Sequence, residues 1–325
     1  MSTGLAIGID IGGTKVAGGV VDEQGRISHR VRRDTPHRST SPRVVEDTIV
    51  EAVEDLLAQV RADSGEDVVA VGIGAAGFVA EDRATVVFAP HLSWRNEPLR
   101  DALAGRIELP ITVDNDANAA AWAEATFGAA RGESHVVVIT LGTGIGGALI
   151  IDGRVQRGRY GIAGEFGHMQ VVPQGARCEC GNRGCWEQYA SGNALVREAR
   201  AMIEAGSPVV VDLLARLGGD KGALTGPFIT EAARDGDATA RELLADIGEW
   251  LGVGMANLAA AFDPGLFVIG GGVSAADEML IGPARDAFRR QLPGRGYRPE
   301  ARIVRAVLGS DAGLIGAAEL ARTGQ

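Results

Sequence analysis

Three cysteines and one histidine lie close together near the middle of the sequence. All three cysteines of the chain fall between positions 178 and 185, and His168 precedes the first of them by ten residues. Three thiolates and one imidazole make a complete tetrahedral ligand set for Zn²⁺, with no open position for a reactive water. We therefore predict a structural zinc site formed by His168, Cys178, Cys180 and Cys185. The alternative is three ordinary thiols.

Two glycine-rich turns have the composition of phosphate-binding loops. The segment 8–15, GIDIGGTK, follows an apolar run, and the segment 142–147, GTGIGG, follows a second one. Glycines let backbone N–H groups approach a phosphate, Thr14 can donate a hydroxyl and Lys15 supplies positive charge. Asp10 could hold Mg²⁺ through water. Plain hairpins are the alternative. The candidate phosphate-binding residues are Asp10, Gly12, Gly13, Thr14, Lys15, Gly142, Thr143 and Gly144.

The spacing G-x-G-x-x-G occurs at 72–77 and again at 142–147. In a dinucleotide-binding fold this motif opens a helix, whereas strand-like or turn residues follow both copies here. We therefore exclude a dinucleotide site. A separate run, Gly270 to Gly272, follows a strand and precedes a helix. Gly271 and Gly272 there are candidates for close approach to a nucleotide, with a simple helix entry as the alternative.

Asp114, Asn115 and Asp116 stand where a strand gives way to an alanine-rich helix. Such residues commonly cap a helix. They can also hold a substrate hydroxyl, with one aspartate as general base. Glu165 and Glu187 flank the cysteine cluster and are either solvated acids or acceptors for a polyol.

The elements that must position these residues repeat along the chain. Each half opens with a strand, a glycine-rich turn and a second strand, and then alternates helix and strand. The first half uses Leu5–Asp10 and Val16–Asp22, and the second uses His135–Leu141 and Ala148–Ile151. This pattern predicts two α/β domains facing one cleft, with a hinge near 114–116.

Composition narrows the class of protein. The chain has 325 residues, 46% of them hydrophobic and 23% charged, which is typical of a soluble globular protein of about two domains. Its net charge of −10 argues against nucleic-acid and anionic-membrane partners. The start, Met-Ser-Thr-Gly, has no basic leader, and the apolar stretch 251–273 is interrupted by Asn257 and Asp263-Pro264. We expect a cytoplasmic protein.

Taken together, these motifs resemble the ROK family of sugar kinases and repressors, most closely its bacterial glucokinases of the actinobacterial type. The resemblance follows the motifs in order along nearly the whole chain, and the cysteine cluster followed by WEQYASG at 186–192 is its most specific part. It implies an actin-like ATPase fold, a duplicated ribonuclease-H-like α/β fold with two domains around a cleft. We expect the small domain at 1–115 with 311–325, and the large domain at 116–310.

The resemblance also implies roles for single residues. Asp116 would be the general base for the 6-hydroxyl of the sugar, and the two glycine turns would hold the phosphates of ATP with Mg²⁺. Gly271 and Gly272 would lie near adenosine. Other sugar contacts would come from Gly77, Asn115, Glu165, His168 and Glu187. Many relatives carry a proline in the loop that reads GAAGF at 74–78 here.

The resemblance implies ATP-dependent phosphorylation of glucose by a homo-oligomer, a dimer or a tetramer. Mannose, fructose or an N-acetylhexosamine are alternative substrates, and polyphosphate is an alternative donor. A sugar-responsive repressor would need a DNA-binding helix-turn-helix ahead of the first phosphate turn. That turn begins within ten residues of Met1 in an acidic chain, so the sequence favours the kinase.

Overall fold

The computed structural model describes residues 4–325, which form two compact units. The first unit contains the chain up to Ser134, Ala148–Gly164 and Val307–Gln325, and the second contains His135–Gly147 and Glu165–Ala306. Compared with the predicted ranges, the first unit also includes 116–134, 148–164 and 307–310. The expectation of no leader peptide rests partly on residues 1–3, which lie outside the described residues.

The first unit is built on a five-stranded sheet of order β3-β2-β1-β4-β8. The strands β1 (Leu5–Ile11), β2 (Lys15–Val21) and β3 (Ile27–Asp34) are antiparallel neighbours. β4 (Val68–Ala75) and β8 (Ile111–Asn115) run parallel to β1. The predicted strands in this region are therefore confirmed.

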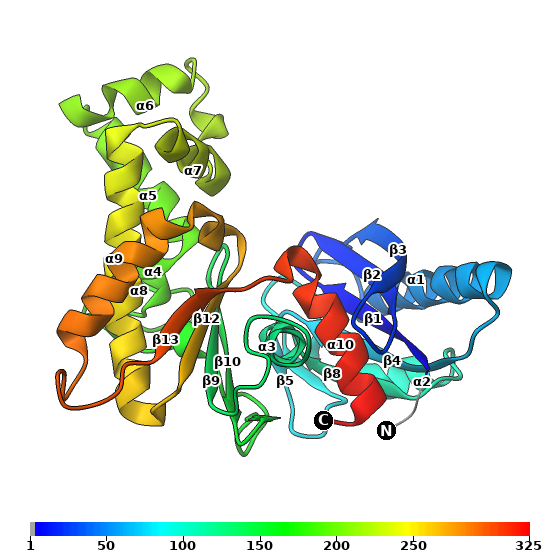
Figure 1. The fold of residues 1–325 in the computed structure, drawn as a ribbon. Coiled ribbons are helices and arrows are strands. Elements are labelled where there is room, and N and C mark those ends of the chain that lie inside the picture. Colours follow the sequence, from blue (N-terminus) through cyan, green and yellow to red (C-terminus); the bar gives the residue numbers. More distant parts are fainter. Residues whose placement is uncertain (1–3) are drawn as a thin grey trace. The chain divides into compact units, whose positions relative to one another are not determined.

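Successive residues of β1 lie on opposite faces of the sheet, so the two faces pack against different elements. Ile7, Ile9 and Ile11 are fully buried in the core that contains the apolar stripe of α1 (Pro42–Asp63). On the other face Gly8 lets α10 (Ala312–Thr323) approach, because a Cβ at Gly8 would lie 2.0 Å from the carbonyl oxygen of Leu314. Figure 1 shows α10, in red, running along this sheet. Asp10 shares the face of Gly8, so it comes next to the start of α10.

The helix α3 (Asp116–Thr126) packs tightly on α10. A Cβ at Gly316 would lie 1.7 Å from the carbonyl oxygen of Ala119, so the two backbones are in direct contact. The buried carboxylate of Glu124 accepts backbone N–H groups from Ala129, Val307 and Leu308 at 2.8 to 2.9 Å. Glu124 therefore fixes the segment that leads into α10.

A small antiparallel sheet, β5 (Phe78–Val79), β6 (Val86–Phe88) and β7 (Arg95–Glu97), follows β4 and precedes α2 (Leu99–Ala104). A hairpin at Asp152-Gly153, where both residues have positive φ, 52° and 70°, joins β10 (Ile145–Ile151) to β11 (Arg154–Val155).

In the second unit β12 (Leu266–Gly270) lies between β9 (Val136–Leu141) and β13 (Arg302–Arg305) in parallel register. The long helix α8 (Ala238–Phe262) packs on α9 (Glu278–Gln291), side by side in Figure 1. The other helices of this unit are α4 (Glu187–Ala190), α5 (Gly192–Glu204), α6 (Val211–Arg216) and α7 (Gly226–Arg234). Among the described residues, none of the helices has both the length and the apolar character needed to span a membrane.

Candidate functional site

The carboxyl ends of β1, β4 and β8 place three predicted segments at one sheet edge in the first unit. Asp10 is in register with Gly74, and Gly74 is in register with Asp114. Parallel α/β sheets bind ligands at this edge. The glycine turn after Asp10 and the helix start after Asp114 are therefore neighbours, although more than a hundred residues separate them in the sequence.

The turn after β1 is a tight hairpin. The N–H of Gly12 donates to the carbonyl of Lys15 at 3.0 Å, and Thr35 donates its hydroxyl to the carbonyl of Gly12 at 2.8 Å. Asp10 is packed against the first turn of α10, where a Cβ at Gly313 would lie 3.1 Å from the Asp10 carboxyl carbon. Burial raises the pKa of Asp10 from 3.8 to about 6, and the Lys15 charge partly offsets this rise. Carboxylate oxygens are the ligands that a hard divalent ion such as Mg²⁺ takes, so the Asp10 side chain fits such an ion.

Asn115 caps α3 and also holds the loop that carries Gly77. Its side-chain oxygen accepts the N–H groups of Ala117 and Asn118, while its side-chain nitrogen donates to the carbonyl of Gly77 at 3.0 Å. Asp116 is the first residue of the helix, and its carboxylate accepts the N–H of Ala117 at 3.0 Å. The capping role is therefore confirmed for Asn115, and the binding of a hydroxyl at this turn stays a prediction.

Asp114 lies behind this turn and is buried. Two nitrogens of Arg157, Nε and Nη2, donate to its Oδ2 at 2.9 and 2.6 Å, and Nε of Arg83 lies 3.4 Å from the same oxygen. Its Oδ1 accepts the N–H of Asn115 and the side-chain amide of Asn118. Burial and the Arg157 charge lower the pKa of Arg83, whereas Asp114 raises it.

In the second unit, the second glycine turn is held by the residues around α4 and α5. The carbonyls of Gly142 and Thr143 accept the N–H groups of Gly192 and Asn193 at 2.9 and 3.2 Å. Oε2 of Glu187 accepts the N–H of Ile145 at 2.9 Å. Glycine at 144 makes this approach possible, because a Cβ there would lie 2.0 Å from the same Glu187 oxygen.

A pocket of about 410 Å³ opens beside this turn, wholly within the second unit. The start of α5, the start of α7 and the residues after β12 complete its wall. The lining residues are Gly142, Thr143, Gly192, Asn193, Val196, Leu224, Thr225, Gly226, Pro227, Thr230, Gly272 and Val273. The wall is apolar with a few hydroxyl and amide groups and no charged side chain, which suits the uncharged part of a nucleotide.

The predicted zinc ligands come together in space. The candidate ligand atoms of His168, Cys178, Cys180 and Cys185 all lie within 4.8 Å of one another. Sγ of Cys180 is 3.6 Å from Sγ of Cys185, and Sγ of Cys178 is 3.7 Å from Nδ1 of His168. Ligands about 2.3 Å from a tetrahedral zinc ion are about 3.8 Å apart, so this spacing fits the metal.

Local structure explains how the cysteines meet. Positive φ at Gly181 (96°) and Gly184 (75°) turns the chain sharply between the first and last cysteine. Burial, and hydrogen bonds that the Cys185 thiol makes to the neighbouring cysteine sulfurs, raise the pKa of Cys185 to about 12, so a bound cation is needed to hold it as a thiolate at neutral pH. The donor set therefore fits Zn²⁺.

Glu165 connects the cysteine cluster with the other candidate sugar ligands of this unit. Its Oε2 lies 4.0 Å from Nε2 of His168. Burial raises the pKa of Glu165, the His168 charge lowers it and the Glu187 charge raises it again. An acidic and imidazole surface of this kind can hydrogen-bond a polyol.

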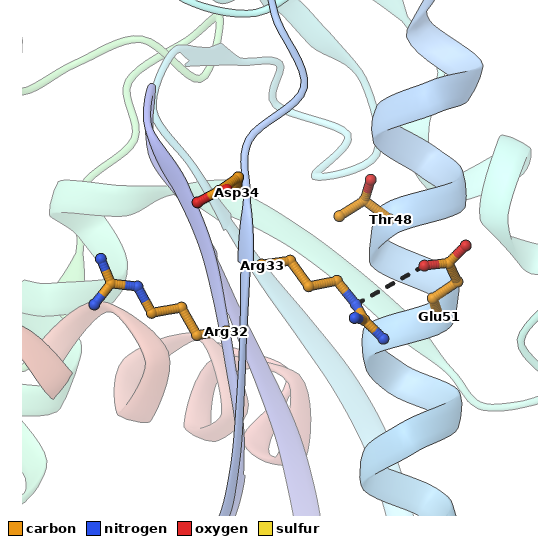
Figure 2. Close-up of a pocket in the computed structure, with 5 residues that line it drawn as sticks. All are labelled: Arg32, Arg33, Asp34, Thr48 and Glu51. Atoms are coloured by element: carbon orange, nitrogen blue, oxygen red, sulfur yellow. Dashed lines mark ion pairs between the residues drawn. The ribbon is translucent and has the colours of Figure 1, made fainter.

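A second hollow, of about 610 Å³, lies on the first unit between β3 and α1 (Figure 2). Two of its charged groups, Arg33 and Glu51, pair with protein partners: Arg33 lies 2.6 Å from Asp55 and 4.0 Å from Glu51. Figure 2 shows Arg32 pointing away from the Arg33 side of the strand. We assign no ligand to this open, polar surface.

Sequence reasoning missed much of the 410 Å³ pocket and all of the Asp114 network. Val196, Leu224 and Thr230 carry no local chemical signature. Thr225-Gly226-Pro227 is a helix-start signal, with Thr225 as the cap of α7, and this signal could have marked one wall.

Comparison with known proteins finds similar proteins that match along nearly the whole chain. The model of the ROK family matches residues 6–324. A glucokinase of Streptomyces coelicolor is 48% identical over 98% of both chains. A crystal structure of a ROK family glucokinase from Streptomyces griseus, in complex with glucose and AMPPNP, is 50% identical, with a TM-score of 0.87 over 98% of this chain and 100% of that one. A ROK hexokinase from Thermus thermophilus is 35% identical, with a TM-score of 0.79 over 98% of each chain.

Proposed function

The chain belongs to the ROK family and has its actin-like ATPase fold, and from this we propose that it is a glucokinase that transfers the γ-phosphoryl group of ATP to the 6-hydroxyl of glucose. The observation that carries the proposal is the match, over nearly the whole of both chains, to the Streptomyces griseus glucokinase that binds glucose and AMPPNP. The ordered motifs at Asp10, Asp116 and Gly142 support the same activity.

In the proposed reaction Asp116 accepts the proton of the glucose 6-hydroxyl. A bond forms between O6 and the γ-phosphorus while the bond from that phosphorus to the β,γ-bridging oxygen breaks, so that ADP leaves. Asp116 suits this task because the cap at Asn115 fixes the helix turn that carries it. Asn115 and Gly77, which are hydrogen-bonded to each other, are proposed as further sugar contacts.

Phosphate contacts are proposed for both glycine turns. Gly12, Gly13, Thr14 and Lys15 supply N–H, hydroxyl and ammonium donors on the first unit, and Gly142, Thr143 and Gly144 supply donors on the second. Bound Mg²⁺ would offset the negative charge of the phosphates. Asp10 would hold this ion, because its carboxylate is buried at the end of β1 beside that turn.

The adenosine part of ATP is assigned to the 410 Å³ pocket. Its volume and its mostly apolar wall support this assignment, and Gly142 and Thr143 link it directly to the phosphate turn. Gly272 lines this pocket. Gly271, the preceding residue, has a positive φ that lets the chain pass close to Leu141.

Zinc is proposed as a structural ion on His168, Cys178, Cys180 and Cys185. The site is fully supplied by protein ligands, so no water is activated there. The proposed effect is indirect: the ion fixes the orientation of the His168 ring. Glu165, His168 and Glu187 are proposed to accept or donate hydrogen bonds to the remaining glucose hydroxyls.

A panel of sugars and phosphate donors tests the proposal. Purified protein with Mg²⁺ is given glucose, mannose, fructose or N-acetylglucosamine, with ATP or polyphosphate, and both the sugar phosphate and ADP are measured. Formation of glucose 6-phosphate from MgATP at the highest kcat/KM supports the proposal. Efficient turnover of another hexose, with none of glucose, would show that the substrate assignment is wrong.

We also propose that the protein acts in the cytoplasm, where ATP is made, as a homo-oligomer of two or four chains. Light scattering of the purified protein measures the mass directly. A mass of about 34 kDa, corresponding to the 33.7 kDa chain, would contradict the oligomer.

A further inference from the structure

We infer that Arg157 is a positioning residue for phosphoryl transfer, acting through Asp114 on the first turn of α3, which carries Asp116. This inference rests on the proposed function. Asp114 joins two sets of partners: one carboxylate oxygen binds the helix turn, through the N–H of Asn115 and the side chain of Asn118, and the other binds Arg157.

Arg157 is built into the interior of the first unit. It follows β11, its side chain is 17% exposed, and its Nη2 also donates to the backbone oxygen of Gln325 at 3.1 Å. Arg159, two residues later, is 75% exposed and pairs with Glu81, which is itself 61% exposed. Only the first of these two arginines has a buried carboxylate as its partner.

The chemistry explains why such an anchor matters. A general base must be aligned with the hydroxyl that it deprotonates, and an error of about 1 Å in such a position can lower the rate about 100-fold. Asp116 stands between Asn115 and Asn118, the two residues that Asp114 holds. If Asp114 shifts, the helix turn loses both contacts and keeps the Asn115 cap as its remaining support, so we expect the Asp116 carboxylate to move with the turn.

Because Arg83 remains, removing Arg157 is expected to change the hydrogen-bond geometry at Asp114 rather than to remove all positive charge beside it. Nε of Arg83 lies 3.4 Å from the same Asp114 oxygen, so a positive partner remains when Arg157 is removed. What disappears is the pair of convergent donors, Nε and Nη2. A lysine at 157 keeps the charge but cannot place two planar N–H groups on one oxygen.

The experiment compares Arg157→Ala and Arg157→Lys with the matched control Arg159→Ala. The substrate panel is run first on the wild type, and the sugar and donor that it uses best serve for every variant. If the proposed function is wrong, the wild type itself shows it. If this inference is wrong, only the ratio of the variant kcat to the wild-type kcat shows it. We expect kcat to fall about 10- to 100-fold in Arg157→Ala, with KM for ATP changed less than about threefold. Arg157→Lys is expected to be intermediate, and Arg159→Ala to match the wild type.

Two further measurements separate positioning from damage to the fold. Guanidinium ion at low millimolar concentration should restore part of the kcat of Arg157→Ala and have no effect on the wild type. Adding Asp114→Asn to Arg157→Ala should lower kcat by less than the product of the two separate losses, because both changes remove the contact between Arg157 and Asp114. If the alanine variant does not fold, Arg157→Lys and Asp114→Asn supply the same comparison.

The inference is wrong if a folded Arg157 variant keeps the wild-type kcat, or if the losses in the double variant multiply. It is also wrong if active-site titration of the Arg157 variant shows a smaller fraction of active molecules, each with the wild-type turnover. Misfolding alone would give that result.

Discussion

The Nδ1 atom of His168 lies 3.7 Å from Sγ of Cys178, while the Nε2 atom of the same ring faces Glu165 at 4.0 Å. One imidazole thus joins the candidate metal cluster to a candidate sugar ligand. If Nδ1 binds zinc, the ring carries its proton on Nε2, where it can donate to an oxygen. Removing the metal would therefore release the ring and weaken sugar binding.

We expect one Zn²⁺ per chain in the wild type and much less in Cys180→Ser, because a serine hydroxyl is a poor zinc ligand. The KM for glucose should rise about tenfold or more in this variant, by analogy with the loss of residues that orient a metal ligand. Elemental analysis and a glucose titration measure the two effects.

Glu179→Gln is the control for this change, since Glu179 is an exposed neighbour of Cys180 outside the ligand set. It should keep both zinc and glucose affinity. A metal-free wild type with full activity would refute the zinc assignment. A Cys180→Ser protein without zinc but with normal glucose affinity would refute only the coupling.

Much of the fold could be predicted because its signals are local. The alternation of large and small residues in β1 indicates a strand that is covered on both faces. In the structure Ile9 packs in the core with α1, and Gly8 lies against α10. The cysteine cluster was equally visible, since its ligands fall within 18 residues, from His168 to Cys185. Such patterns need no knowledge of distant parts of the chain.

The remaining parts of the candidate site depend on long-range packing. Nothing in the sequence distinguishes Arg157 from Arg159, and only the approach of β11 to α3 gives the first of them a buried partner. The wall of the 410 Å³ pocket likewise combines Asn193 and Thr225 from the starts of two different helices. Composition and periodicity carry no information about such contacts between residues that are far apart in the sequence.

Asp116→Asn should lower kcat by about 10²- to 10⁴-fold, the range expected for loss of a general base. Glucose binding should change less, since an amide still forms hydrogen bonds. Rapid-quench kinetics and a glucose titration separate the two quantities. Asp101→Asn, at a side chain that is 72% exposed on α2, should behave like the wild type. Near-normal turnover in a folded Asp116→Asn protein would exclude the base role.

At neutral pH the buried, charged Asp10 side chain should lower the free energy of unfolding. Its pKa is raised from 3.8 to about 6, so between these values the folded state keeps a proton that the unfolded chain has released. The folded state then binds more protons, and stability falls as pH rises through this window. Above about pH 6 the cost is complete. At 1.36 kcal/mol per pKa unit it is at most about 3 kcal/mol.

Asp10→Asn removes this cost. We expect its melting temperature to exceed that of the wild type at pH 8, and the difference to shrink as pH falls to about 4. Turnover should nevertheless drop at least about tenfold, because the proposed Mg²⁺ ligand is lost. Thermal melts without nucleotide at several pH values measure the stability, and a coupled assay measures the activity. A difference in melting temperature that does not change with pH would contradict burial of a charged Asp10.

The pocket beside the second glycine turn should decide the affinity for ATP. Val196 lies on α5 and lines this pocket, so Val196→Trp would fill part of the 410 Å³ assigned to adenosine. We expect KM for ATP to rise at least about tenfold, which corresponds to a loss of about 1.4 kcal/mol of binding. KM for glucose should change much less. Initial rates over a grid of both substrate concentrations give the two constants separately.

Val209→Trp is the matched control, because Val209 is 55% exposed and does not line the pocket. It should leave both KM values unchanged. If polyphosphate also serves as donor, Val196→Trp should not affect that reaction, since polyphosphate has no base to occupy the pocket. A folded Val196→Trp protein with the wild-type KM for ATP would place adenosine elsewhere. An equal loss with ATP and with polyphosphate would mean that the tryptophan disturbs the phosphate turn at Gly142 and Thr143 rather than a nucleoside site.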